Sequence, residues 1–109
     1  MRARSNKAMN SQKQNDKIEY IKETLRPLFD SYKIKRAVLF GSTAKKLDRD
    51  DSDIDIVVDG NLTGLKFFGF LEKASRLFEN EIDLIEQSQI NKDSKIDHEI
   101  KNEGIVIYG

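Results

Sequence analysis

Two aspartates two positions apart, Asp53 and Asp55, are the residues best suited to chemistry in this sequence. On a β-strand, side chains at i and i+2 lie on the same face a few ångströms apart. Carboxylates that close repel each other unless one is protonated or a cation lies between them. Oxygen ligands with no His or Cys nearby favour a hard cation, and a pair that leaves room for water and phosphate suits Mg²⁺. The spacing therefore predicts a magnesium site that accepts a nucleotide.

Gly41 and Ser42 follow an apolar run and could bind the phosphates of that nucleotide. A strand that ends in Gly-Ser and leads into a helical turn presents free backbone N–H groups and a small hydroxyl. Asp83 lies on a later strand with the same phase, where it could bind the metal and accept a proton from an attacking hydroxyl. In-line displacement at phosphorus needs little more. The alternative interpretations are a turn glycine at position 41 and an exposed strand-end aspartate at position 83.

A calcium-binding loop is the competing explanation for the aspartate-rich segment. The EF-hand pattern started at Asp51 places Ile56 where glycine is required and Leu62 where glutamate is required, so this pattern is excluded. Asp48, Asp50 and Asp51 are expected to be solvated surface residues.

The elements that position these residues follow from the hydrophobic spacing. Strands are expected at residues 35–40, 53–59, 81–86 and 105–108. Helices are expected at residues 16–31, 43–47 (a single turn) and 63–78, with a thin apolar stripe over 88–103 that stops at Gly104. Strands that alternate with helices predict an α/β fold with helices on one face of a small sheet. We expect Phe67, Phe68, Phe70 and Phe78 to form its core, with room for one of them to stay exposed for a partner.

Length and charge limit the organisation of the chain. Its 109 residues, 38% of them hydrophobic, are enough for one domain. The 19 basic and 19 acidic residues cancel, but the basic residues are concentrated near the N-terminus and the aspartates between positions 48 and 59. Residues 1–15 are predicted to be a disordered basic tail, and residues 16–109 to be the domain. Direct binding of nucleic acid is not expected, and a homo- or hetero-oligomer is left open.

The sequence argues against several kinds of metal site and against a membrane-spanning segment. The sequence has no Cys, and His98 alone cannot form a multi-histidine metal site. No apolar stretch approaches the roughly 20 residues of a membrane span, and the N-terminus has no signal-peptide core. We therefore expect a cytoplasmic protein.

These motifs resemble the DNA polymerase beta nucleotidyltransferase superfamily, and specifically the minimal nucleotidyltransferases that pair with HEPN-domain proteins. The resemblance covers residues 16–109. The matching segments are Leu39-Phe40-Gly41-Ser42-Thr43-Ala44-Lys45, Asp51-Ser52-Asp53-Ile54-Asp55-Ile56, Ile82-Asp83-Leu84-Ile85 and Glu103-Gly104-Ile105-Val106-Ile107-Tyr108.

The resemblance implies an α/β (α+β) fold with a small mixed sheet, and it implies roles for individual residues. Asp53, Asp55 and Asp83 would be the catalytic residues and the Mg²⁺ ligands. Gly41 and Ser42 would contact the nucleoside triphosphate. The family often has Ala-Arg-Gly after Gly-Ser, whereas Ala44 is followed here by two lysines. Lys45 can still hold phosphate, although as a point charge rather than through two parallel hydrogen bonds.

The implied reaction is transfer of AMP from ATP to a hydroxyl group, with pyrophosphate leaving. Members that pair with HEPN ribonucleases are thought to be antitoxins, some of which adenylylate a tyrosine of the toxin. The expected partner is therefore a HEPN-type helical toxin encoded nearby, which brings the acceptor. The alternatives are a binding module that neutralises its partner without catalysis and, third, an enzyme that modifies small molecules.

Overall fold

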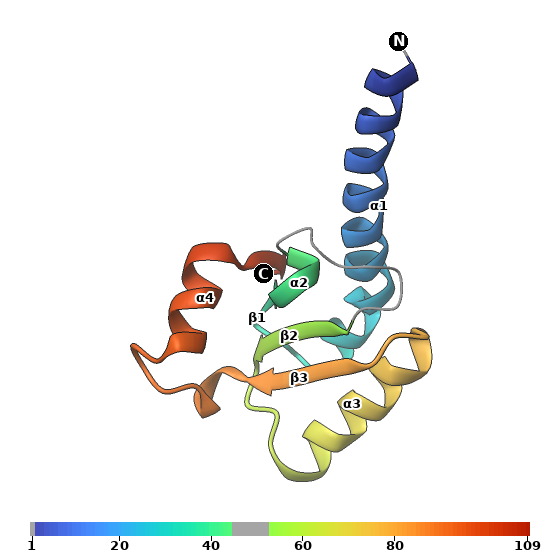
Figure 1. Ribbon diagram of the computed structural model, residues 1–109. Coiled ribbons are helices and arrows are strands. Elements are labelled where there is room, and N and C mark those ends of the chain that lie inside the picture. The colour runs from blue at the N-terminus through green and yellow to red at the C-terminus, as the bar shows by residue number, and fades with distance from the viewer. Residues whose placement is uncertain (1, 45–52) are drawn as a thin grey trace.

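The computed structural model describes residues 2–44 and 53–109, with side chains for residues 16–41, 44 and 53–109. Four strands form one mixed sheet in the order β3-β2-β1-β4. The elements in chain order are α1 (Arg2–Ser31), β1 (Arg36–Phe40), α2 (Gly41–Ala44), β2 (Ile54–Asp59), α3 (Gly64–Leu77), β3 (Ile82–Glu86), the 3-10 turn η1 (Gln87–Gln89), α4 (Lys95–Glu103) and β4 (Ile105–Tyr108). The expected small mixed sheet with helices is confirmed (Figure 1).

The sheet combines two kinds of strand pairing. β1 pairs antiparallel with both β2 and β4, whereas β2 pairs parallel with β3. A parallel pair needs a crossover connection, and α3 supplies it between β2 and β3. The free edges of the described sheet are therefore β3 and β4.

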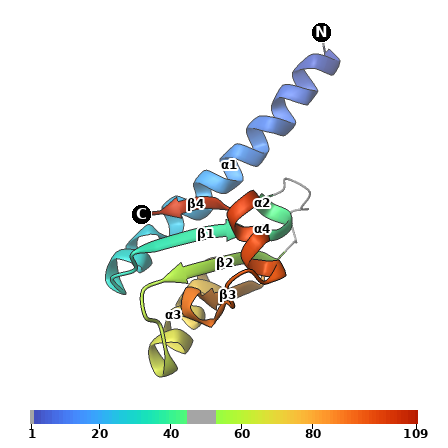
Figure 2. The same cartoon turned by 90° about the vertical axis from the view of Figure 1, so that its left-hand side faces the viewer.

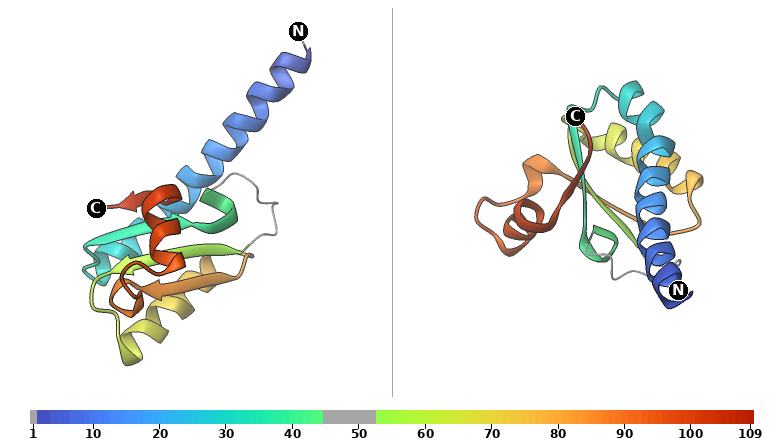
Figure 3. Two further views of the ribbon diagram at one scale, coloured as in Figure 1. Left: turned by 60° about the vertical axis from the view of Figure 1, so that its left-hand side comes forward. Right: turned by 90° about the horizontal axis from the view of Figure 1, so that it is seen from above.

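Helices cover both faces of the sheet, as the view from above shows (Figure 3). The expected cover on one face is supplied by α1 and α3, and α4 lies over the opposite face (Figure 2). α4 is needed there because Val38, Phe40 and Val57 are buried on that face as well. A side chain at Gly104, just after α4, would meet Val38 Cγ1 at 2.6 Å, so this helix end packs directly on the sheet.

Alternation along β2 places most of its apolar side chains on one face of the sheet and Asp55 on the other. Ile54, Ile56 and Val58 are buried in the main hydrophobic core beneath α1 and α3. Asp55 therefore faces the other side of the sheet, as the period of two predicts. The same holds on β3, where Ile82 and Leu84 belong to the core and Asp83 is exposed.

Helix α1 begins at Arg2, well before the start expected at Asp16. Residues 2–15 contain neither Gly nor Pro, so nothing in the sequence stops the helix from continuing toward the N-terminus. Its first half projects beyond the sheet (Figure 1), and its second half packs Ile21, Leu25 and Phe29 into the core. The division into a tail over 1–15 and a domain over 16–109 stays a prediction.

None of the described helices is long and apolar enough to cross a membrane.

Apart from the start of α1, the element boundaries follow the predictions closely, and α2 is the further correction. Strands β1, β2 and β3 each begin one residue later than expected, and β4 has the expected bounds. The short helix was expected at residues 43–47, but α2 begins at Gly41. Gly41 adopts a positive φ of 75°, so the chain turns into the helix immediately after β1. The expected loop over 48–52 lies outside the described residues.

The phenylalanines of α3 differ in how deeply they are buried. Phe70 is fully buried, stacked on Phe29 with ring centroids 5.8 Å apart and edge-on to Tyr32 at 5.3 Å. Phe67 is partly buried against the same core. Phe68 is 65% exposed, so one phenylalanine of the expected cluster does remain on the surface.

Removal of the Phe70 ring should therefore be costly. Phe70→Ala leaves a cavity between α1 and α3, and we expect it to lower the free energy of unfolding by about 3–5 kcal/mol. Phe68→Ala removes the same ring from the same helix and should change stability by less than about 0.5 kcal/mol. Chemical denaturation measures both values, and equal losses would contradict this account of the core.

Candidate active site

Asp55 and Asp83 are brought together by the parallel pairing of β2 and β3. The register sets these two residues directly opposite each other. Their side chains share the face that α4 partly covers and lie close enough for a proton on one carboxyl group to form a hydrogen bond with the other. Asp55 is half-buried and Asp83 is exposed, so the pair lies at the surface of the sheet where a ligand can reach it.

The electrostatics of this pair favour a bound proton or cation. The pKa of Asp55 is raised from its ordinary value of 3.8 to about 6. Burial of the carboxyl group is the largest cause, and the hydrogen bond to Asp83 and its negative charge are next. The charges of Asp53 and Glu99 add to the effect. A cation between the carboxylates would replace the proton, because it removes the same repulsion.

Gly41 leaves open the space that the Asp55 carboxylate occupies. Phe40 pairs with Asp55 across β1 and β2, so Gly41 follows immediately beside it. A Cβ atom at Gly41 would lie 3.0 Å from Asp55 Cγ and overlap its Oδ2 atom. The absence of a side chain therefore lets the carboxylate approach the backbone at the start of α2.

The structure describes the other predicted site residues only in part. Asp53 precedes β2, is exposed, and acts on Asp55 through its charge. Among the described side chains, no group of three or more His, Cys, Asp or Glu residues is gathered into a metal site. The backbone of Ser42 belongs to α2, but its side chain and the whole of Lys45 lie outside the described residues.

Glu99 on α4 is a residue near the site that we did not predict. Its negative charge acts on Asp55 from the helix that covers this face. Ile96 and Ile100 form the apolar stripe of α4, and Glu99 follows Ile96 by three positions, which places both on neighbouring parts of one helix face. That spacing is the signal that could have identified it.

Comparison with known families identifies the family of this chain. The family model for "Polymerase beta, Nucleotidyltransferase" matches residues 23–109, which include Gly41, Asp53, Asp55 and Asp83. The chain belongs to the polymerase beta nucleotidyltransferase family. It is thus a nucleotidyltransferase, and the resemblance found in its motifs is confirmed at the level of the family.

A curated relative agrees with this assignment. The nucleotidyltransferase is 37% identical over 76 residues to "Putative protein adenylyltransferase MJ1215" of Methanocaldococcus jannaschii. The alignment covers 64% of this chain and 88% of the relative.

Solved structures share the fold of the nucleotidyltransferase. One, a toxin–antitoxin pair with AMP-PNP, matches with a TM-score of 0.70 and 20% identity over 81% of this chain and 73% of the other. Another is a tri-AMPylated HEPN toxin of Shewanella oneidensis in complex with its MNT antitoxin, with a TM-score of 0.66 and 18% identity over 84% and 72%. The expected polymerase-beta-like fold is therefore confirmed.

A methyl group at Gly41 should disturb the nucleotidyltransferase more than one at Gly64. Both glycines have positive φ, so Ala at either position costs about 1 kcal/mol in backbone strain. Only at Gly41 does the new atom also overlap a side chain, since nothing lies within 4 Å at Gly64. We expect Gly41→Ala to lower the melting temperature further than Gly64→Ala. Equal melting temperatures would show that Asp55 does not occupy this space.

The raised pKa of Asp55 predicts a pH-dependent stability in the absence of divalent cations. The contribution of Asp55 to the free energy of unfolding is fully present below pH 3.8. It is lost as the pH rises through about 6, because the folded state disfavours the charged form of this carboxyl group. Asp55→Asn removes that charge. We therefore expect the variant to melt a few degrees above the wild type at pH 8, and this difference to shrink between pH 6 and 4.

Asp59→Asn, at the other end of β2, provides the control for loss of one negative charge. Calorimetry in the presence of a chelator measures the melting temperatures of the wild type and both variants. If Asp55→Asn raises the melting temperature by the same amount at pH 4 and pH 8, the titration of Asp55 is not the cause.

Proposed function

We propose that this nucleotidyltransferase transfers AMP from ATP to a hydroxyl group of a partner protein, namely a tyrosine of a HEPN-type toxin that it neutralises. The observation that carries the proposal is the carboxylate pair Asp55 and Asp83 beside the open backbone at Gly41. The name of the Methanocaldococcus relative supports protein adenylylation. The contents of the structural neighbours, AMP-PNP and an AMPylated HEPN toxin, support the nucleotide and the partner.

The residues present fit Mg²⁺. Mg²⁺ is usually bound by one or two carboxylates together with water and substrate phosphates, so it does not need a complete cage of side chains. Asp55 and Asp83 supply such a pair, with Asp53 as a third carboxylate close by, and the pKa of Asp55 is raised to about 6 by burial and by the neighbouring carboxylates. When bound, Mg²⁺ would neutralise the negative charge of the phosphates.

The remaining steps use the residues of this chain. The backbone at Gly41 and Ser42, with Lys45, would bind the triphosphate. Asp83 is the more exposed carboxylate of the pair and would accept the proton of the attacking hydroxyl. The hydroxyl oxygen then bonds to the α-phosphorus, and the bond to the β-phosphate oxygen breaks, so that pyrophosphate leaves.

A labelling experiment tests this function. The wild-type protein, incubated with its neighbouring helical partner, Mg²⁺ and labelled ATP, should label the partner on tyrosine. Asp55→Asn and Asp83→Asn should lower labelling at least about a thousandfold, because both remove groups that touch the reacting atoms. Glu72→Gln, on the exposed surface of α3, is the matched control and should label normally.

Binding of the partner separates catalysis from neutralisation by complex formation. We expect the aspartate variants to bind the partner as tightly as the wild type and yet to lose protection against its toxicity. Full protection by these variants, or no labelling with any of the four nucleotides, would contradict the proposed function.

A further inference from the structure

The outer edge of β3 combines three features that suit it to receive an acceptor. It is the end of the described sheet, it lies beside an apolar groove, and it carries Asp83. We propose that an extended, basic segment of the acceptor protein adds to β3 as a further strand and thereby places its hydroxyl next to Asp83. This inference rests on the proposed transfer to a protein and names the surface that receives the acceptor.

Within the part of the chain that the structure describes, the backbone of β3 has no neighbouring strand on its outer side. Ile54 N–H donates to the Glu81 carbonyl at 2.8 Å, so Glu81 directs its backbone groups toward β2. Backbone groups of successive strand residues point to alternate sides, so Asp83 and Ile85 do the same. Ile82, Leu84 and Glu86 therefore direct their N–H and C=O groups outward. Such an edge is a template for an added strand.

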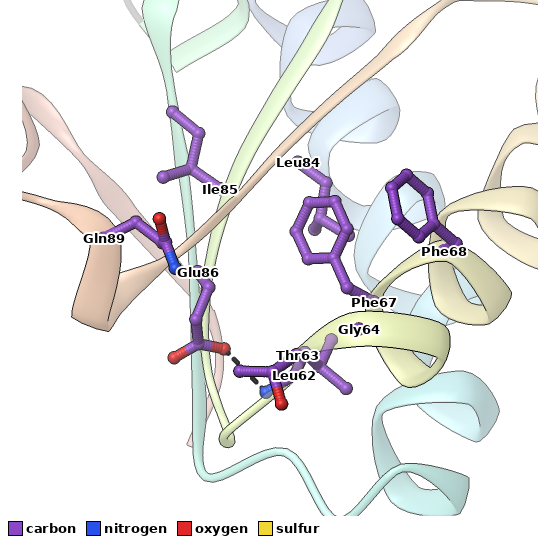
Figure 4. A pocket seen from close by; sticks show the side chains of 9 residues that line it. All are labelled: Leu62, Thr63, Gly64, Phe67, Phe68, Leu84, Ile85, Glu86 and Gln89. Carbon is purple, nitrogen blue, oxygen red and sulfur yellow. Dashed lines mark hydrogen bonds between the residues drawn. The ribbon is translucent and has the colours of Figure 1, made fainter.

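An apolar groove of about 390 Å³ runs along this edge (Figure 4). Leu84 and Ile85 both line it, although they point to opposite faces of the sheet. Only the outer edge can be reached from both faces, since β2 occupies the inner one. Phe67 and Phe68 of α3 form the opposite wall. The exposed ring of Phe68 thus belongs to this surface.

The floor of the groove is fixed by a buried carboxylate. Glu86 is 1% exposed, and its Oε2 accepts a hydrogen bond of 3.0 Å from Leu62 N–H. This bond joins the end of β3 to the loop before α3, so the groove is formed without an occupant. A preformed apolar groove lowers the ordering cost of binding.

Charge indicates the kind of segment that fits. Glu81 and Asp83 are exposed at alternate positions of this edge. A strand that carries Lys or Arg is complementary to these carboxylates, whereas an acidic strand would be repelled. The occupant is therefore an extended basic segment.

The register specifies where its side chains go. Neighbours across a sheet share a face, so a residue opposite Leu84 enters the groove and a residue opposite Asp83 lies on the active-site face. The acceptor hydroxyl would become the third group in a row after Asp55 and Asp83. The acceptor segment should thus have its hydroxyl residue directly adjacent to a large apolar residue.

A synthetic peptide tests this arrangement. The probe is a ten-residue peptide with Phe-Tyr at its centre, flanked by Lys and Val. With the full chain labelled with ¹⁵N, it should shift the amide resonances of Ile82, Leu84 and Glu86, and its tyrosine should accept AMP. A peptide with Val inserted between Phe and Tyr, or one methylated on alternate backbone nitrogens, should bind at least about tenfold more weakly.

Two exposed residues of α3 give matched variants. Phe68→Asp should weaken binding of the Phe-Tyr peptide about tenfold, because it places a charge in the groove. Leu65→Asp is the control: Leu65 is 90% exposed on the same helix but does not line the groove, so binding should be unchanged. Melting temperatures verify that both variants are folded.

The outcomes distinguish this inference from the proposed function. The inference is overturned if Phe68→Asp labels the helical partner as fast as the wild type, or if the methylated peptide binds as well as the unmethylated one. If the Phe-Tyr peptide shifts the β3 amides but neither peptide nor partner is ever labelled, the proposed transfer fails and the docking surface stands.

Discussion

Repulsion between two carboxylates is the constraint on which the rest of this structure depends. The parallel register of β2 and β3 sets Asp55 opposite Asp83, and burial of Asp55 makes its charge costly. A fold optimised only for stability would avoid such a pair. Its presence at a surface that ligands can reach is instead typical of functional sites, where perturbed pKa values are common.

The surrounding elements serve this pair in different ways. The crossover through α3 makes β2 and β3 parallel and buries the opposite face of the sheet in the core. Gly41 gives the Asp55 carboxylate the room it needs beside the start of α2. Helix α4 covers the rest of the active-site face and adds the negative charge of Glu99. The main hydrophobic core thus lies on one face of the sheet, and the carboxylates of the candidate site lie on the other.

In the proposed reaction, the location of β3 at the edge of the sheet would connect catalysis with recognition of the acceptor. Asp83 belongs to the same strand whose outer backbone is unpaired in the described sheet. An acceptor bound there would need no separate domain, because the strand that aligns it also carries the carboxylate beside the reaction. The groove formed by Leu84, Phe67 and Phe68 would then set which residue of the acceptor reaches Asp83.

The sequence by itself determined the family, the strands and the face on which the aspartates lie, because alternation of apolar and acidic residues is a local property of each strand. It also indicated that one phenylalanine of α3 could remain exposed. Only the tertiary structure decided the pairing of Asp55 with Asp83, the room beside Gly41 and the approach of Glu99, because these depend on strand register and on packing between segments distant in the chain. The extent of α1 and the helix on the second face also came only from the structure. The length of a helix and the face of the sheet that it covers depend on packing between distant segments, and the hydrophobic spacing along one segment does not contain that information.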